Sequence, residues 1–385
     1  MPAESGAGPV VPKASAGSLA RAILPVLLLS AAARADQIEY TAYSFGDNRR
    51  NEVATTSFSL LKTIFDKTRM LLDVELDQTT IPPLEPDAFT GASRPARQSK
   101  SAFLKNRGQI IAGLQHDLFA NTELSARYYF SQEVDYRSQA VIGGIAQSFA
   151  ERNFTVELVG QYTLDSVGEI RDDGSLLNRL KETHKGALRI TQLLSPVSFV
   201  RMGVDGQRDQ GFLSDPYRKV EGSGGALISE QVPDMRYRGA GWLEYSRFLA
   251  SLRASWSAEY RYAFDDWNLA SHMLWLKLNK YVTADWILST QYRYYFQSGI
   301  DFGEYAGAGS AAFFAPGDDK LKDEEYNFLG LGVTCYLRAF ARNHPTWDFL
   351  RRSSVALKYS RYFSTASQSE TFAGNLLETR LRFEF

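Results

Sequence analysis

The sequence holds few of the residues from which catalytic and metal sites are usually built. Its 385 residues include one cysteine, Cys335, and four histidines. A single cysteine excludes an intramolecular disulfide, and without a Cys-x-x-Cys-His segment a covalently attached c-type haem is excluded too. No pair of histidines has the close spacing of a metal site. We therefore predict that the protein is not an enzyme and that it binds no cofactor or metal.

Long apolar runs and an excess of charge of one sign are also missing. After residue 35, no segment has the roughly 20 consecutive apolar residues that a transmembrane helix needs. The formal net charge is −1, which gives no reason to expect nucleic acid as a partner. Aromatic residues, by contrast, make up 13% of the chain, and many stand at every second position. This combination is typical of proteins that cross a membrane with strands.

The N-terminal segment has the features of an export signal. Two basic residues precede an apolar run over 22–29, and a small-residue cleavage pattern follows at Ala33-Arg34-Ala35. A membrane anchor is the alternative, but the run is too short to span a bilayer and contains Pro25. We predict a cleaved signal peptide over 1–35 and a single exported domain over 36–385.

Alternation of apolar and polar side chains is the main structural signal in the exported domain. Residues 252–265 show it most clearly, since successive side chains of a strand point to opposite faces. One face carries Leu252, Ala254, Trp256, Ala258, Tyr260, Tyr262 and Phe264. The other carries Arg253, Ser255, Ser257, Glu259, Arg261 and Asp265. One face therefore meets an apolar medium and the other a wet interior, as in a transmembrane barrel.

The same pattern recurs along the domain and predicts sixteen strands. They are 38–47, 52–64, 68–79, 105–117, 122–134, 139–150, 153–165, 184–194, 197–208, 235–248, 251–264, 269–281, 284–298, 324–338, 353–365 and 374–385. An even count fits single-chain barrels of the bacterial outer membrane. We predict a closed antiparallel β-barrel in the outer membrane of a Gram-negative bacterium, in contact with lipid and lipopolysaccharide.

The gaps between these strands alternate between tight turns and long connections. The long gaps, all on one side of the barrel, are 80–104, 166–183, 209–234 and 299–323. One longer connection, 339–352, falls among the tight turns. Because periplasmic turns are short and extracellular loops long, both termini are expected in the periplasm. The Gly- and Ala-rich stretch 306–316 is the first candidate for a loop that folds into the barrel, with an outward loop as the alternative.

The chain ends on an alternating strand whose last residue is aromatic. Leu381, Phe383 and Phe385 share one face of this strand, and Arg380 and Arg382 share the other. The arrangement resembles the C-terminal signal by which the barrel-assembly machinery recognises outer-membrane barrels, so we expect that machinery as a partner. A soluble β-protein that happens to end in Phe is the alternative, and the export signal disfavours it.

A short motif follows the ninth predicted strand. It reads Gly211-Phe212-Leu213-Ser214-Asp215-Pro216-Tyr217-Arg218-Lys219-Val220. The favoured interpretation is a turn in which Pro216 fixes one corner and Asp215 caps it. A ligand site built on Gly211, Asp215, Pro216 and Tyr217 is the alternative.

This motif resembles one in the predicted outer-membrane barrels of domain-of-unknown-function family 3570. The segments Leu193-Leu194-Ser195-Pro196 and Asp87-Ala88-Phe89-Thr90-Gly91-Ala92-Ser93 are similar to that family as well. The resemblance implies a barrel over nearly the whole exported domain. It implies no activity, and Phe212 stands where the family pattern leads us to expect Tyr.

The inner face of the predicted barrel carries charge of both signs. The lumen candidates are Arg107, Arg127, Glu157, Arg253, Glu259, Arg261 and Arg293. Two interpretations stay open: these charges pair across the interior and stabilise the wall, or a surplus of positive groups favours the passage of anions.

Our leading functional prediction is a porin-like or substrate-selective channel, because about sixteen strands leave an aqueous lumen unless a loop fills it. The alternative is a non-conducting scaffold that anchors or threads an exported periplasmic partner. In that case Trp347 and Phe349, within 339–352, would dock the partner. An outer-membrane hydrolase using His116 or His272 is a third and weaker alternative. The sequence names neither a solute nor a partner.

Overall fold

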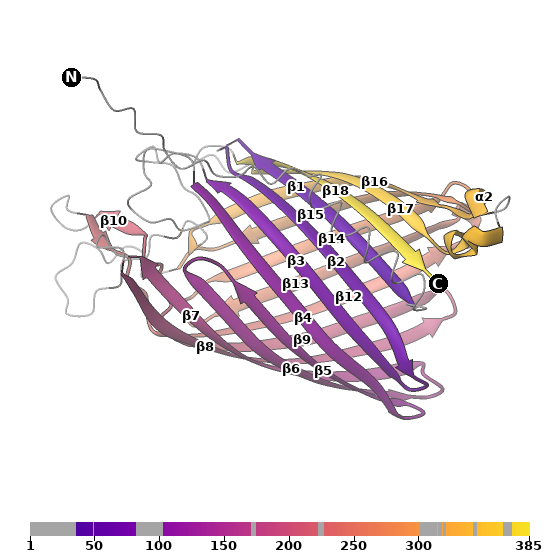
Figure 1. The fold of residues 1–385 in the computed structure, drawn as a ribbon, viewed down its shortest axis with the longest axis horizontal. Coiled ribbons are helices and arrows are strands. Elements are labelled where there is room, and N and C mark those ends of the chain that lie inside the picture. Colours follow the sequence, from indigo (N-terminus) through magenta and orange to yellow (C-terminus); the bar gives the residue numbers. More distant parts are fainter. Residues whose placement is uncertain are drawn as a thin grey trace, which may run out of the picture.

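Figure 1 shows a single closed antiparallel β-barrel, which confirms the predicted fold class. The structure, a computed structural model, describes residues 36–48, 50–81, 103–170, 175–221, 227–300, 314, 318, 321–341, 345–364 and 372–385. The barrel strands are β1 (Gln37–Asp47), β2 (Glu52–Phe65), β3 (Thr68–Ile81), β4 (Phe103–Phe119), β5 (Thr122–Gln132), β6 (Tyr136–Phe149), β7 (Phe154–Ile170), β8 (Leu176–Ser195), β9 (Ser198–Gly211), β12 (Met235–Leu249), β13 (Ala254–Asp265), β14 (Ala270–Tyr281), β15 (Trp286–Gln297), β16 (Glu324–Tyr336), β17 (Ser354–Ser364) and β18 (Ala373–Glu384). The predicted signal peptide, residues 1–35, lies outside the described residues.

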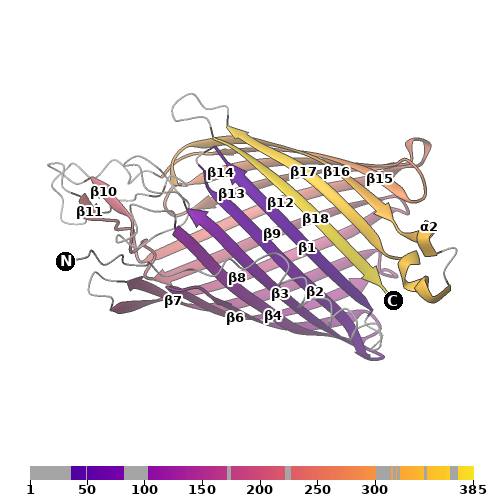
Figure 2. The same ribbon diagram turned by 45° about the horizontal axis from the view of Figure 1, so that its top comes forward.

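Each barrel strand pairs with its neighbour in the chain, and the first strand closes the barrel against the last. In Figure 2, β1 and β18 lie side by side along their whole length. Their pairing runs from Gln37 opposite Glu384 to Asp47 opposite Gly374. Beyond the strands, the backbone N–H of Phe385 donates to the carbonyl oxygen of Asp36 at 3.3 Å. The described ends of the chain therefore meet at one rim of the barrel.

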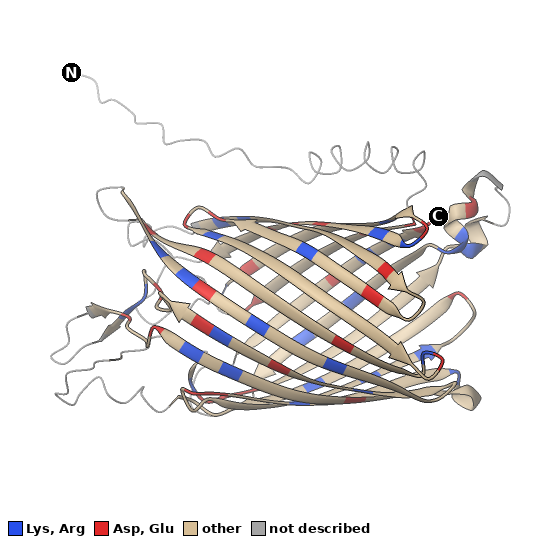
Figure 3. Ribbon diagram, turned by 90° about the horizontal axis from the view of Figure 1, so that it is seen from below, with Lys and Arg blue, Asp and Glu red and all other residues tan. Residues whose placement is uncertain are grey.

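The two faces of the wall differ as the alternation predicted. Large apolar side chains such as Leu158, Leu243 and Leu331 are exposed on the outer face. The inner face is polar, with Ser131, Ser138 and other small polar residues packed between charged groups. Figure 3 shows Lys and Arg interspersed with Asp and Glu along the strands rather than gathered at one rim. An apolar exterior around a charged interior is the surface that a bilayer-spanning barrel needs.

The rims of the barrel differ in the length of their connections. Tight turns join β2 to β3, β4 to β5, β6 to β7 and β8 to β9, as predicted. At the other rim, most of the predicted loops 80–104 and 299–323, including most of 306–316, lie outside the described residues. The gap 209–234 contains a separate hairpin, β10 (Lys219–Glu221) with β11 (Leu227–Ser229), which sequence analysis missed. We call these the short-turn rim and the long-loop rim.

The prediction of a long loop over 166–183 is wrong. β7 continues to Ile170 and β8 begins at Leu176. The two strands remain paired up to these residues, which lie opposite each other. An ion pair between Arg179 and Glu169, 3.2 Å long, supports the extension. Polar residues had marked this stretch as a loop, but strands that project beyond the bilayer are wetted on both faces and need no apolar alternation.

The long connection at the short-turn rim folds into two short helices. α2 (Arg338–Ala341) and the 3-10 segment η5 (Pro345–Arg351) lie beside the C-terminal end of β18 in Figure 1. The ring of Phe349 stacks on that of Phe385, with centroids 5.6 Å apart and planes 11° from parallel. In the part of the chain that the structure describes, no helix is long and apolar enough to span a membrane. The connection therefore packs on Phe385, the last residue of the predicted assembly signal.

The single cysteine lies on the outer face of the wall. Cys335 of β16 stands opposite Trp286 of β15, whose ring is exposed on the same face. Because that face meets lipid, we expect a charged, water-soluble thiol reagent to leave Cys335 unmodified in vesicles. A membrane-permeant maleimide should modify it. Rapid modification by the charged reagent would place Cys335 in the lumen and invert the assigned register of β16.

Candidate functional site

The lumen wall brings together side chains from strands far apart in the sequence. One row across the sheet runs from Arg127 on β5 through Gln161, Lys185 and Gln207 to Arg238 on β12, each residue on a strand hydrogen-bonded to the next or next but one. Neighbouring strands are about 4.8 Å apart, so such a row sets polar groups at regular intervals around the interior. The wall is therefore a continuous polar surface.

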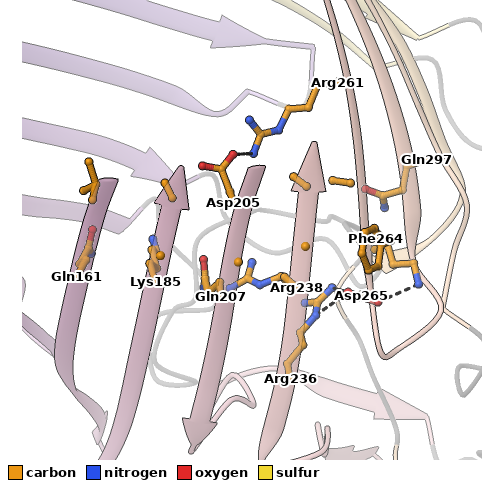
Figure 4. A pocket seen from close by; sticks show the side chains of 18 of the residues that line it. Gln161, Lys185, Asp205, Gln207, Arg236, Arg238, Arg261, Phe264, Asp265 and Gln297 are labelled. Carbon is orange, nitrogen blue, oxygen red and sulfur yellow. Dashed lines mark hydrogen bonds and ion pairs between the residues drawn. The ribbon is translucent and has the colours of Figure 1, made fainter. Parts of the chain in front are cut away.

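A cavity of about 690 Å³ lies against the part of this wall formed by β7 to β15. Figure 4 shows several of its side chains projecting from these strands into the lumen. Its cationic lining residues are Lys185, Arg189, Arg236, Arg238 and Arg261. Its acidic lining residues are Asp205, Asp265 and Asp318. Counted over these lining residues alone, five cations face three carboxylates, a formal net charge of +2; Asp209 and Glu157, the partners of Arg238 and Arg189, lie outside the lining.

Most of these charges are paired. Arg261 donates to Asp205 at 2.9 Å, as Figure 4 shows, and Arg238 binds Asp209 at 2.5 Å. Arg236 forms an ion pair with Asp265 in which the donating Nε lies 2.7 Å from the carboxylate. The Asp265 side chain is only 1% exposed, so this pair is the most deeply buried of the set.

Two cations of the cavity are weakly neutralised. Arg189 reaches Glu157 at 3.5 Å, and both side chains are about two-fifths exposed. Lys185 is exposed in the lumen and forms no ion pair with the described residues. A solvated pair of this kind has little interaction energy and leaves most of the cation's field in the lumen. Lys185 and Arg189 are therefore the cations of this cavity whose charge is least neutralised.

A second cavity, about 480 Å³ in volume, adjoins the first toward β4. Arg107 lies at its edge, with its Nε 2.6 Å from Asp77 and its Nη2 3.3 Å from Glu75. Lys181 pairs with the buried Asp165 at 3.1 Å. The balance of charge here is closer to neutral than in the first cavity.

The structure places the predicted lumen residues in different settings. Arg107, Glu157 and Arg261 face the interior and form the ion pairs described above. Arg127 faces the interior and has no ion pair among the described residues. Glu259 stands opposite Glu244 on one side and Trp275 on the other, and it too forms no ion pair within the described chain.

The prediction for Arg253 is wrong. β13 begins at Ala254, and Arg253 ends the 3-10 turn Ala250–Leu252 with a left-handed backbone, at φ 48° and ψ 48°. Its N–H donates to the carbonyl oxygen of Ala250 at 3.1 Å. The alternation continued smoothly through the turn, so the pattern alone did not show that the strand, predicted from residue 251, begins only at Ala254.

Arg293 lies among aromatic rings rather than carboxylates. Its guanidinium carbon is 5.0 Å from the ring centroid of Phe328, 5.7 Å from that of Tyr362 and 5.8 Å from that of Tyr326. Trp275 is 5.9 Å away on the neighbouring strand. The barrel interior thus has a charged wall on β7 to β13 and an aromatic wall on β14 to β17.

The loop motif forms the predicted turn. Asp215 accepts a hydrogen bond from the backbone N–H of Tyr217 at 2.9 Å, which caps the corner set by Pro216. Gly211, the first residue of the motif, has φ +105°, and a Cβ there would lie 2.5 Å from the carbonyl oxygen of Leu180. The glycine is required by its backbone rather than by a ligand.

The motif also fixes the loop to the wall, which the turn interpretation did not foresee. The hydroxyl of Tyr217 accepts from the N–H of Ile170 at 3.0 Å, and burial raises its pKa well above the ordinary value for tyrosine. Arg218 pairs with Glu230, which is 2% exposed, at 3.0 Å and with Asp318 at 3.5 Å. Asp318 also lines the first cavity, so the two loops meet at the lumen mouth.

The two histidines considered for hydrolysis lie on the outer face of the barrel. His116 contacts the hydroxyl of Thr68 at 2.9 Å, and His272 contacts that of Tyr260 at 2.7 Å. Among the described residues, no group of three or more His, Cys, Asp or Glu is placed to hold a metal ion.

Several lumen residues escaped the sequence analysis. Lys181, Lys185, Asp165, Asp209 and Arg236 line the cavities, but some stand beyond the predicted strand ends or close to them. A signal was available, because Asp165 and Asp209 keep the inward parity of β7 and β9. Extending each strand by its parity, rather than by its apolar residues, would have found them.

Comparison with known proteins confirms the resemblance to domain-of-unknown-function family 3570. A family profile described as protein of unknown function (DUF3570) matches residues 88–307. The similar segment Asp87–Ser93 lies outside the described residues, whereas Leu193–Pro196 lies at the turn between β8 and β9. No curated protein matches the sequence.

Solved outer-membrane barrels share the fold at low sequence identity. A ferric enterobactin receptor of Pseudomonas aeruginosa, PfeA, is 12% identical, with 86% of this chain and 53% of the receptor covered and a TM-score of 0.44. A bacterial polysaccharide outer membrane secretin is 9% identical, covering 91% and 99%, with a TM-score of 0.49. The outer membrane protein OpdK of Pseudomonas aeruginosa is 7% identical, covering 91% and 98%, with a TM-score of 0.43. The chain spans about half the length of the receptor, and these similarities concern the fold alone.

Proposed function

The chain belongs to the DUF3570 family of outer-membrane β-barrels, and we propose that it is a porin-like channel whose lumen favours small anions. The observation that carries this proposal is the cavity on β7 to β15, where Lys185 forms no ion pair with the described residues and Arg189 forms only a long, solvated one. A surplus of fixed positive charge raises the local concentration of anions and lowers that of cations. No catalytic group is required.

The distribution of pairing supports selection rather than simple reinforcement of the wall. Arg236 and Arg261 are held by carboxylates, which stabilise the wall and fix its shape. Lys185 and Arg189 keep most of their charge exposed to the lumen. Both interpretations of the lumen charges therefore apply, each to a different set of residues.

Membrane placement follows the same proposal. We propose that residues 1–35 are removed on export and that the short-turn rim, with both ends of residues 36–385, faces the periplasm. Leu381, Phe383 and Phe385 would serve as the signal to the barrel-assembly machinery. The outer face would contact lipid and, near the long-loop rim, lipopolysaccharide.

The proposal is tested by planar-bilayer conductance of the refolded chain 36–385, with and without residues 301–320. We expect discrete steps and a reversal potential on the anion side in a salt gradient. If neither protein conducts ions, the channel proposal is wrong. If only the shortened protein conducts, the removed segment closes the lumen.

One observation favours a scaffold as the second candidate. At the short-turn rim, Phe340 is 60% exposed and Trp347 is 47% exposed, on α2 and η5 respectively. Phe349, the other residue considered for docking, is instead occupied by Phe385. Replacement of Phe340 and Trp347 by serine should abolish co-purification of a periplasmic protein if the scaffold is correct. Unchanged co-purification would count against it.

A further inference from the structure

Arg293, in the aromatic wall, differs from most other arginines of the lumen in its partners. The other described lumen arginines, apart from Arg127, have a carboxylate within ion-pair distance, but Arg293 has none among the described residues. Its one hydrogen bond goes from Nη2 to the hydroxyl of Tyr362, at 3.4 Å. Its Nε is buried with no hydrogen-bond partner. Arg293 is thus a partly desolvated cation, and some of its N–H groups have no acceptor among the described residues.

A second donor in the same group is also unsatisfied. Trp275, directly opposite Arg293 on β14, has a buried indole Nε1 without a partner. Lys277, two residues along β14, places its ammonium 3.4 Å from the centroid of the Trp275 ring. Buried donors without partners cost free energy, and clusters of them mark positions where an acceptor is missing. Here the missing acceptor would be an anion, because one of the two donors belongs to a cation and the ammonium of Lys277 lies over the ring that carries the other.

The rings define the rest of the site. Phe328 is 5% exposed and forms its base, while Tyr362 and Tyr326 flank the guanidinium. Tyr295 stacks on Tyr326, with centroids 4.7 Å apart and planes 21° from parallel. Tyr295 also lines the large lumen cavity, so the aromatic wall is continuous with the space through which a solute would move.

We infer that this group, named here the Arg293 aromatic site, binds small aromatic carboxylates. The carboxylate would accept the spare N–H groups of Arg293 in a two-pronged contact, which suits the planar guanidinium. The flat ring of the ligand would pack in an offset or edge arrangement on the tyrosines and Trp275. The inference names a solute class for the proposed channel, but binding itself does not depend on conductance.

Alternative ligands fit the site less well. A cation would meet Arg293 and Lys277, which repel it. A neutral sugar would use the rings but would leave the desolvated guanidinium without a counter-charge. An aliphatic anion such as acetate would satisfy Arg293 but would not use the rings. Only an anion with a flat apolar body matches both halves of the site.

The test is equilibrium binding of benzoate to the refolded chain 36–385 in detergent, with acetate and glucose as comparison ligands. We expect saturable benzoate binding that Arg293→Gln weakens at least tenfold and Arg293→Lys weakens by less. Trp275→Leu should reduce affinity for benzoate while leaving the weak binding of acetate unchanged. The matched control is Arg127→Gln, which removes another lumen arginine that lacks an ion pair and should have no effect.

The outcomes separate this inference from the proposed channel. Saturable benzoate binding in a barrel that never conducts would retain the site and overturn the channel. A conducting barrel with no saturable benzoate binding, or with equal binding in the Arg293→Gln and Arg127→Gln variants, would overturn the site. Glucose binding that is insensitive to Arg293→Gln would assign the aromatic wall to neutral ligands and would also overturn it. Circular dichroism of each variant checks that the barrel has folded, and the lysine variant keeps the test decisive if the glutamine variant does not fold.

Discussion

Replacing Asp265 by alanine is expected to lower the free energy of unfolding of the refolded barrel by about 3 kcal/mol, since removal of one partner strands a buried charge. Asp265 is 1% exposed and its partner Arg236 is 15% exposed. The carboxylate also accepts the backbone N–H groups of Trp267 at 3.0 Å and Leu269 at 2.9 Å, which shape the turn from β13 to β14. The change therefore removes an ion pair and two turn contacts together.

The measurement is urea-induced unfolding in lipid vesicles, followed by intrinsic fluorescence. Asp205→Ala is the matched control, because Asp205 pairs with Arg261 in the same cavity but is 30% exposed. An exposed pair contributes about 1 kcal/mol or less. Equal losses of stability in the two variants would contradict the assignment of Asp265 as the buried anchor of the wall.

Reversing the charge of Lys185 and Arg189 is expected to turn an anion-preferring channel into a cation-preferring one. The double change Lys185→Glu and Arg189→Glu takes the formal charge of the cavity from +2 to −2. Fixed charge in a narrow, low-dielectric passage acts directly on the ions inside it. The new carboxylate at residue 189 would face Glu157, but that side chain is 39% exposed and the repulsion is screened. The readout is the reversal potential in a salt gradient.

A control variant carries the same change of formal charge outside the lumen. It separates the effect of the lumen charges on the reversal potential from the effect of the surface potential. Arg50 and Arg352 are exposed in connections at the two rims and form no ion pair with the described residues. Their replacement by glutamate should leave the sign of the reversal potential unchanged. If the reversal potential changes sign in the rim variant and not in the lumen variant, the cavity on β7 to β15 does not determine the ion selectivity of the channel. High salt should weaken the lumen effect, since screening grows with ionic strength.

The fold could be predicted from the sequence because a bilayer-spanning wall must alternate at every second residue. That requirement holds only where one face meets lipid. It fails at the far ends of β7 and β8, where the residues from Val167 to Ile170 are half-buried or buried and show no apolar–polar alternation, so that they resemble a loop. It fails again at Arg253, because a turn residue can keep the parity of the strand that follows.

The site was less predictable, because it depends on register. The inward position of Arg261 and Arg293 follows from parity, but their partners do not. Arg261 meets Asp205 only because β9 and β13 flank β12 in a particular alignment. Arg293 meets Phe328 and Tyr362 through the pairing of β15 with β16 and of β16 with β17. A shift of two residues would keep every side chain on its face and exchange every partner.

The seam between β1 and β18 has a consequence for how the barrel forms. Every other strand pairs with a neighbour along the chain, whereas the seam joins residues as distant as Gln37 and Arg382, whose side chains meet at 3.0 Å. Pairings between distant residues carry the largest loop-closure entropy and form slowly. The hairpins can therefore assemble early, while the sheet stays open along two unsatisfied edges until the last strand arrives. Closure is then the step at which an incomplete barrel is exposed to wrong partners, and the rate of folding should respond to changes in β1 and β18 more than to changes elsewhere in the wall.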